Sequence, residues 1–272
     1  MPEFPTSIGT SDPTTIRLLG HDLATDLLGQ VGFGELAFWL AARRRPSDGE
    51  VRLFEAVLVS LTDHGFTPTA IAARLTYYSA PDSVQGALAA GILGGGSRFL
   101  GVTEDTGRWL HGVLEGLDGH EPRGDANWDG VALDAVRAAR AAGEKVPGLG
   151  HPVHKEADPR VPVMVAIAEE SGSLGDHLRL FAAVGRVHEQ VLGRRLPLNG
   201  AGVAGAALAD LGLPIDLLRA FALLARTAGL IGHLAEEREM PIAPAVYAEV
   251  DRNAVYVPLP DVPDVPDRPG RS

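Results

Sequence analysis

Apolar residues recur at helical spacing along most of this chain. They return every three or four positions, which places them on one face of a helix, and glycine or proline separates many of the resulting segments. The segments expected to be helical are 27–44, 50–63, 68–76, 83–93, 103–117, 128–142, 161–171, 175–193, 200–211 and 215–239. The alternation typical of strands is almost absent, and its best candidate is 255–257. The pattern predicts an all-α fold.

The two ends of the chain depart from this pattern. Residues 1–13 are rich in proline, serine and threonine, so we expect an N-terminal arm. Residues 258–272 contain five prolines and few apolar side chains to bury, which predicts a flexible C-terminal tail.

Composition excludes several classes of protein. Of the 272 residues 45% are hydrophobic, enough for a sizeable core. The net charge of -11 argues against a nucleic-acid partner, because phosphate binding relies on clustered Lys and Arg. The longest apolar runs, 201–209 and 220–225, are well short of the roughly 20 residues that cross a membrane. The chain has no cysteine and no basic segment leading into an apolar leader. We expect a cytoplasmic protein that binds neither nucleic acid nor membrane.

Residues 148–160 concentrate more usable chemistry than any other stretch, with the sequence Gly-Leu-Gly-His-Pro-Val-His-Lys-Glu-Ala-Asp-Pro-Arg. Gly148 and Gly150 allow backbone angles closed to other residues, so they can present His151 from a tight turn. Asp158 and the proline after it are typical of the start of a turn or helix, which would carry Arg160. The pattern predicts an active-site loop.

This loop resembles the signature of the citrate synthase family, a Gly-x-Gly-His turn followed by Asp-Pro-Arg. Three further segments match in the right order and resemble the citryl-CoA lyase module of ATP-citrate lyase and stand-alone citryl-CoA lyases. They are the Asp-His-Gly at 63–65, the glycine-rich segment 91–99 and the Arg-x-x-Gly-x-x-Gly-His at 226–233. The match runs from about residue 50 to 257. It implies a homodimer, with a large helical domain (14–96 and 208–257) and a smaller one (97–207) across a cleft.

The resemblance also implies roles for the matched residues. His64 would donate a hydrogen bond to a substrate carbonyl or carboxylate, and His151 would polarise the oxygen on the carbon where the C–C bond is made or broken. Arg160 and Arg226 resemble the carboxylate clamps of the family, for which the guanidinium fork is suited. The substrates implied are an acyl-CoA thioester and a small organic acid.

Two further assignments concern coenzyme A and a histidine on a helix. Gly148, Gly150 and Lys155 are expected to hold coenzyme A, with the lysine near its phosphates. His233 lies on an apolar helix face, so we expect it to be a structural histidine rather than a catalytic one.

The chain also departs from the family pattern at charged positions. The family carries an aspartate that moves a proton at the carbon beside the thioester; the match places Asn199 there, or Ala201 if it is shifted by two residues. Pro152 follows the signature histidine where the lyases have arginine, and Ala248 follows Tyr247 where they have another arginine. Because loss of a general base typically costs about 10²–10⁴-fold in rate, ordinary citrate chemistry at full speed is not expected.

Three functions remain open at this point. The first is an enzyme that makes or breaks a C–C bond between an acyl-CoA and a 2-oxo acid with fewer carboxylates than citrate. The second is an accessory protein that binds an acyl-CoA or organic acid without turnover, and the third is an acyl-CoA hydrolase.

His151, His154 and Asp158 could in principle ligate a divalent ion, but without a second cluster we expect no metal. The glycine-rich 94–98 lacks the Gly-Lys-Ser/Thr of a phosphate-binding loop, so no ATP site is expected.

Overall fold

The computed structural model describes residues 2–117, 119, 122, 124–151 and 154–258, and this part of the chain is mostly helical, as predicted. The helices are α1 (Phe33–Ala42), α2 (Asp48–Leu61), α3 (Pro68–Ser79), α4 (Val84–Leu93), α5 (Val102–Glu115), α6 (Asp125–Ala141), α7 (Arg160–Glu170), α8 (Asp176–Leu192), α9 (Gly200–Asp210), α10 (Leu218–Glu239) and α11 (Ala243–Arg252). A short 3₁₀ turn, η2 (Ile215–Leu217), leads into α10. The all-α prediction is therefore confirmed, although α11 was not foreseen.

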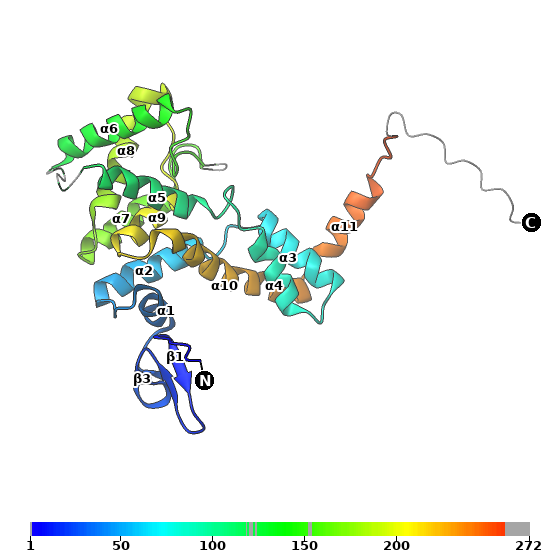
Figure 1. Ribbon diagram of the computed structural model, residues 1–272. Coiled ribbons are helices and arrows are strands. Elements are labelled where there is room, and N and C mark those ends of the chain that lie inside the picture. Colours follow the sequence, from blue (N-terminus) through cyan, green and yellow to red (C-terminus); the bar gives the residue numbers. More distant parts are fainter. Residues whose placement is uncertain (1, 118, 120–121, 123, 152–153, 259–272) are drawn as a thin grey trace, which may run out of the picture.

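A small antiparallel sheet at the N-terminus was not predicted either. Its strands are β1 (Gly9–Ser11), β2 (Ile16–Leu18) and β3 (His21–Asp22), in that order, and a π-helical turn, η1 (Leu23–Leu27), follows. Part of the expected arm, 1–13, thus belongs to a sheet, which lies beyond α1 at one end of the molecule (Figure 1).

Helix starts follow local capping chemistry. Ser47 and Glu50 form a reciprocal capping box at the start of α2, where each side chain accepts from the other residue's backbone N–H. The Thr67 hydroxyl accepts the N–H of Ala70 at the start of α3, whose first residue is Pro68. The Thr67 cap therefore fixes the end of the loop 62–67, which carries His64.

Two apolar clusters hold the helices together. The larger one joins α1 and α2 to α5–α10 and includes Phe38, Phe54 and Phe221, whose rings meet edge to face. The smaller one joins α3 and α4 to the second half of α10, through residues such as Ala73 and Leu230. Helix α10 therefore runs from one packed body into the other (Figure 1). The division at residues 97 and 207 stays a prediction.

The C-terminal segment differs from what the sequence suggested. Residues 255–257, expected as a strand, contain no strand, and the side chains of Val255, Tyr256 and Val257 are 76–85% exposed. Alternation was misleading here, because none of the strands in the described part of the chain pairs with this segment. Most of the expected tail, 259–272, lies outside the described residues. Among the helices of the described chain, none is both long and apolar enough to cross a membrane.

Candidate active site

A pocket of about 540 Å³ lies where the two packed bodies meet. It is lined from the end of α2, the loop before α3, the segment before α5, the 148–160 loop and the starts of α7 and α9, with α10 behind. Its size is within the range of small-molecule sites. Five of the residues expected in a site, which the sequence separates by up to 162 positions, line this one pocket: His64, Gly150, His151, Arg160 and Arg226.

The loop that carries His151 has the backbone that its glycines suggested. Gly148 and Gly150 have φ of +80° and +86°, a region that favours glycine. The loop pairs with the segment before α9, because the N–H of Gly150 donates to Pro197 O (2.7 Å) and the N–H of Asn199 donates to Gly148 O (2.9 Å). The predicted tight turn is thus present, and it is tied to the start of α9.

Hydrogen bonding sets the tautomer of His151. Its Nδ1 accepts the backbone N–H of His154 at 2.9 Å, so a neutral ring carries its proton on Nε2. Burial lowers the pKa of His151, and although Asp158 opposes this, the nearby His154, His64 and Arg160 add to it. At neutral pH the ring is therefore an uncharged N–H donor.

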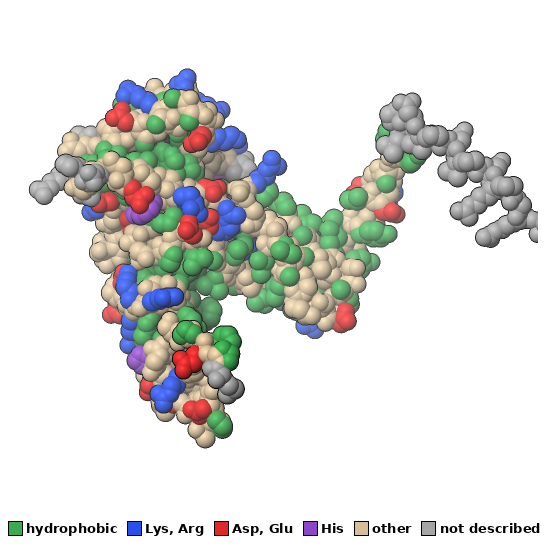
Figure 2. All heavy atoms as spheres, viewed as in Figure 1, with side chains coloured by type: hydrophobic (Ala, Val, Ile, Leu, Met, Phe, Trp, Pro, Cys, Tyr) green, Lys and Arg blue, Asp and Glu red, His purple; other side chains and the backbone are tan. Residues whose placement is uncertain are grey.

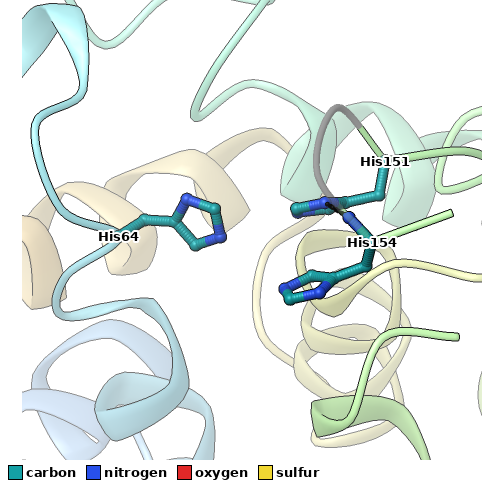
Figure 3. A group of neighbouring side chains, drawn as sticks. All are labelled: His64, His151 and His154. Atoms are coloured by element: carbon teal, nitrogen blue, oxygen red, sulfur yellow. Dashed lines mark hydrogen bonds between the residues drawn. The ribbon is translucent and has the colours of Figure 1, made fainter.

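His64 faces His151 across the pocket mouth. The two rings meet edge on, with centroids 5.3 Å apart. Figure 3 shows His64 pointing from its loop toward His151 and His154 on the opposite side. Burial lowers the pKa of His64 and the guanidinium groups of Arg160 and Arg226 lower it further, so this imidazole is also neutral at pH 7.

Arg160 is held firmly by its own surroundings. Its Nε and Nη2 donate to the two oxygens of Asp158 (3.0 and 2.7 Å), and its Nη1 donates to Ser60 O (3.1 Å). Asp158 also accepts the N–H of Gly200 (2.7 Å). Burial alone would raise the pKa of Asp158, but these donors outweigh it and hold the pKa far below its usual range. Arg160 lines the pocket but keeps only two of its five N–H groups for a ligand.

Arg226 has more capacity to bind an anion. It is 4% exposed, its only described ion pair is a long one to Asp63 (3.4 Å), and its Nε has no hydrogen-bond partner among the described residues. Burial lowers its pKa, Asp63 opposes this, and Arg160 lowers it further. A buried guanidinium that is incompletely paired is costly unless an anion completes its shell.

Asn199 supports the loop with both ends of its side chain. Its Oδ1 accepts the N–H of Gly202 (2.8 Å) and caps α9, while its Nδ2 donates to Gly150 O (2.8 Å). The side chain is therefore committed to backbone groups. Ala201, the other candidate for the position of the base, also lines the pocket.

The remaining predicted residues lie around this centre. Lys155 donates from Nζ to His151 O (3.1 Å) and is exposed outside the pocket lining. His233, expected to be structural, accepts from Arg74 Nε (3.1 Å) and contacts Asp63 with its Nε2 (2.9 Å). Tyr247 is on α11 and is 57% exposed. Pro152 lies outside the described residues.

Two features of the site were missed by sequence reasoning. Arg98 lines the pocket from the glycine-rich segment, where only the glycines drew attention. His154 lies beside His151 with ring centroids 4.5 Å apart, and 6.2 Å from His64. Its spacing of three from His151 was visible, but the approach of His64 depends on the tertiary fold.

The fold is that of a citrate synthase-like protein. The model of the citrate synthase C-terminal domain matches residues 20–244, so the chain belongs to this family. It is 29% identical over 204 residues to 2-methylcitrate synthase 1 of Corynebacterium glutamicum, covering 71% of this chain and 48% of that protein. The chain spans about half the length of the curated relatives it matches.

Solved structures give the same assignment. The citryl-CoA lyase from Hydrogenobacter thermophilus superposes with a TM-score of 0.81 at 28% identity, covering 96% of both chains. The ATP citrate lyase from Methanothrix soehngenii, solved with citrate and coenzyme A, has a TM-score of 0.73 at 22% identity and covers 96% of this chain but 42% of that one. The latter similarity concerns the fold alone.

Proposed function

We propose that the pocket is the active site of an enzyme that makes or breaks a C–C bond between an acyl-CoA and a 2-oxo acid. The observation that carries this proposal is the buried, incompletely paired Arg226 in the same pocket as the neutral donors His64 and His151. An anionic acid would complete the pairing of the arginine, and the imidazoles would face its reacting oxygen. The names of the relatives, a 2-methylcitrate synthase and a citryl-CoA lyase, support the same reaction class.

In the direction of synthesis each group has a defined task. Arg226 pairs with the carboxylate of the 2-oxo acid, and Arg160 adds its two remaining N–H groups. The Nε2–H of His151 donates to the 2-oxo oxygen, which becomes a hydroxyl as the new C–C bond forms. His64 donates to the thioester carbonyl, whose oxygen gains charge when the neighbouring carbon loses its proton. Gly148, Gly150 and Lys155 hold the coenzyme A moiety.

The proton acceptor at that carbon is the part of the site that differs from the family. An amide is no general base, and both ends of Asn199 are engaged with backbone groups. We interpret Ala201, which lines the pocket, as the position of the missing carboxylate. Water or one of the two histidines then takes the proton, so turnover of citrate-type substrates is slow, by roughly 10²–10⁴-fold.

A homodimer in the cytoplasm is the proposed form of the protein. Apolar side chains gather over the part of the molecule that holds α3, α4 and α10 (Figure 2). Exposed apolar side chains of α4, α10 and the loop before α3 are Leu93, Ile231 and Phe66, whose exposed fractions are 85%, 54% and 58%. A surface of this kind is typical of a subunit interface.

A second candidate function is binding of an acyl-CoA or organic acid without turnover. Two observations favour it. The side chain of Asn199 is engaged with the loop, and the described pocket lining contains no carboxylate side chain that could act as base. Hydrolysis of an acyl-CoA is a third, since it needs an oxyanion donor but no base at carbon.

Turnover against a panel of CoA thioesters with and without 2-oxo acids, followed by free thiol and by mass, separates these functions. A condensed or cleaved carbon skeleton supports the proposal. Thiol release without a second product indicates hydrolysis. Binding by calorimetry without any product indicates the accessory role.

A further inference from the structure

A fully buried arginine forms the centre of a polar network beside the pocket. Arg74 of α3 is 1% exposed and does not itself line the pocket. Its Nε donates to Nδ1 of His233 on α10 at 3.1 Å. Its Nη1 donates to Glu237 at 2.9 Å, and its Nη2 pairs with Glu236. All three guanidinium nitrogens are engaged, which fixes the orientation of the Arg74 side chain.

The contact with Arg74 sets the tautomer of His233. A guanidinium can only donate, so Nδ1 of His233 accepts and carries no proton. The ring proton is therefore on Nε2, which lies 2.9 Å from Oδ1 of Asp63 and donates to it. His233 is thus held as a donor toward Asp63.

Asp63 joins this network to the pocket in two ways. Its Oδ1 also pairs with Nη1 of Arg226 at 3.4 Å, and its Oδ2 accepts the N–H of Gly65 at 2.8 Å. Gly65 has φ of +72°, and the hydrogen bond to Asp63 closes the tight turn that carries His64. The carboxylate of Asp63 therefore contacts the groups that place both Arg226 and His64 in the pocket.

Helix α10 lies directly against this turn. Arg226, Gly229 and His233 are three and four positions apart, so they share one face of the helix. A Cβ on Gly229 would overlap with the backbone oxygen of Thr62, so glycine is needed for the close approach. Because the helix and the turn are in contact, the side chain at 226 reaches the pocket and the one at 233 reaches Asp63.

Most of the network is removed from solvent. The side chains of Arg74, Glu237 and His233 are 1%, 3% and 10% exposed. The ring of Phe66, which lines the pocket, has its centroid 5.1 Å from Cζ of Arg74 and 5.8 Å from that of His233. Hydrogen bonds are stronger in such surroundings than in water. Asp63 itself is 44% exposed, so these bonds, rather than burial, hold its carboxylate in place.

We propose that Arg74 is a positioning residue for the pocket. By fixing the tautomer of His233, it holds the carboxylate of Asp63 in place, and Asp63 in turn closes the turn that presents His64. Because Oδ1 of Asp63 already accepts the shorter bond from His233, its contact with Arg226 stays long, and that guanidinium keeps its capacity for an anion. The effect on the organic acid rests on the proposed function, whereas the hydrogen-bond arrangement does not.

Nitrogen NMR of the imidazole rings tests the arrangement without any ligand. We expect His233 of the unchanged chain to carry its proton on Nε2. Lysine keeps a positive charge beside Glu237 but has a methylene where arginine has its Nε–H. Arg74→Lys should therefore give a mixture of tautomers at His233 and shift the ring signals of His64.

Calorimetry with oxaloacetate as the probe measures the consequence for the pocket. Arg74→Lys should bind this acid roughly 2–10-fold more weakly, the effect of about one hydrogen bond. Its affinity for coenzyme A should not change, because the proposed coenzyme A residues lie outside the network. Equal losses for both ligands would show a general structural defect and overturn the proposal.

Glu236→Gln is the matched control. Glu236 is 45% exposed and contacts Arg74 from the side away from the relay, so this variant should keep the tautomer of His233 and the affinity for the acid. If Arg74→Lys does not fold, His233→Gln and His233→Leu replace it. Glutamine can donate to Asp63 and leucine cannot, so His233→Gln should bind the acid more tightly than His233→Leu.

Three results would overturn the proposal. They are a proton on Nδ1 of His233 in the unchanged chain, Arg74→Lys with unchanged signals of His64 or unchanged affinity for the acid, and Glu236→Gln with the same loss as Arg74→Lys. If the unchanged chain binds no oxaloacetate, the proposed function fails instead, and the signals of His233 and His64 still decide the role of Arg74.

Discussion

Arg226 shows at the residue scale how this site balances stability against binding. Its guanidinium is buried with one long ion pair and an unpartnered Nε, an arrangement that burial makes unfavourable in the free protein. An anionic substrate supplies the missing partner. The cost of burying the charge is thereby offset when the ligand binds.

We predict that Arg226→Met weakens binding of the organic acid without lowering stability. Truncating one partner of a buried charge pair typically costs about 2–5 kcal/mol of affinity. Folding should change little, because the remaining Asp63 is 44% exposed and keeps His233 as a partner. Calorimetry with the acid and thermal unfolding measure the two effects. The control is Arg219→Met, because the Nε of Arg219 also lacks a hydrogen-bond partner among the described residues but Arg219 does not line the pocket. Equal acid affinity of Arg226→Met and the unchanged chain would rule out the anchor.

We predict opposite effects for a new aspartate at position 199 and at position 201. Asn199→Asp keeps the helix cap but turns the donor that faces Gly150 O into an acceptor, so stability should fall by about 1–3 kcal/mol with no gain in rate. Ala201→Asp places a carboxylate in the pocket lining and should raise citryl-CoA turnover by up to roughly 10²–10⁴-fold. Unfolding curves and initial rates decide between them. A rate gain in Asn199→Asp alone would show that the interpretation is reversed.

At the scale of elements, the loop 148–150 and helix α9 depend on each other. A Cβ on Gly148 would lie 2.6 Å from the Phe181 ring, and one on Gly202 would lie 2.7 Å from the Cα of Gly148. Glycine is needed at both positions because the loop and the helix approach so closely. This contact, together with the hydrogen bonds to Pro197 and from Asn199, fixes where His151 is presented.

Alanine substitutions at the two loop glycines should therefore have unequal effects. At Gly150, with φ of +86° and no close neighbour, the cost is backbone strain of roughly 1–2 kcal/mol. At Gly148 the overlap with Phe181 adds about 1–3 kcal/mol. Denaturant unfolding of the two variants measures the difference. Equal losses would indicate that the loop is free to move away from α8 and α9.

The sequence predicted those helices whose burial is visible as a regular spacing of apolar residues. Helices such as α8 bury one face in the core, so apolar spacing locates them. Helix α11 was missed because it buries little beyond Ala243 and begins among prolines. The N-terminal sheet was missed because its strands are two or three residues long and mostly exposed, too short for any alternation to appear.

The site could be predicted in part for a similar reason. His151, Arg160 and their glycines lie in one short segment, so the resemblance located them. The commitment of Arg160 to Asp158 and of Asn199 to Gly150 depends on side-chain geometry. The approach of His64 to His154 joins positions 90 residues apart and needs the fold itself.

At the scale of the whole molecule, the lowered pKa values of His64 and His151 link stability to pH. The unfolded chain takes up protons at these histidines near pH 6.5, before the folded chain does. Their contribution to stability is therefore complete above pH 6.5 and is lost as the pH falls toward the lowered folded pKa values. We predict that the double variant His64→Gln/His151→Gln loses less stability between pH 7 and 5 than the unchanged chain. Parallel curves from thermal unfolding would disprove the linkage.

The central claim is that His151 acts on the substrate from a loop whose fold does not depend on it. The most direct measurement compares His151→Ala and His233→Ala with the unchanged chain. For each protein it records the melting temperature and the rate of C–C bond formation or cleavage on the preferred CoA thioester. His151→Ala should lose roughly 10²–10³-fold in rate and no more than about 1 kcal/mol in stability. His233→Ala, which breaks contacts to Arg74 and Asp63, should lose more stability. Full activity in His151→Ala, or a loss of stability as large as that of His233→Ala, would contradict the account.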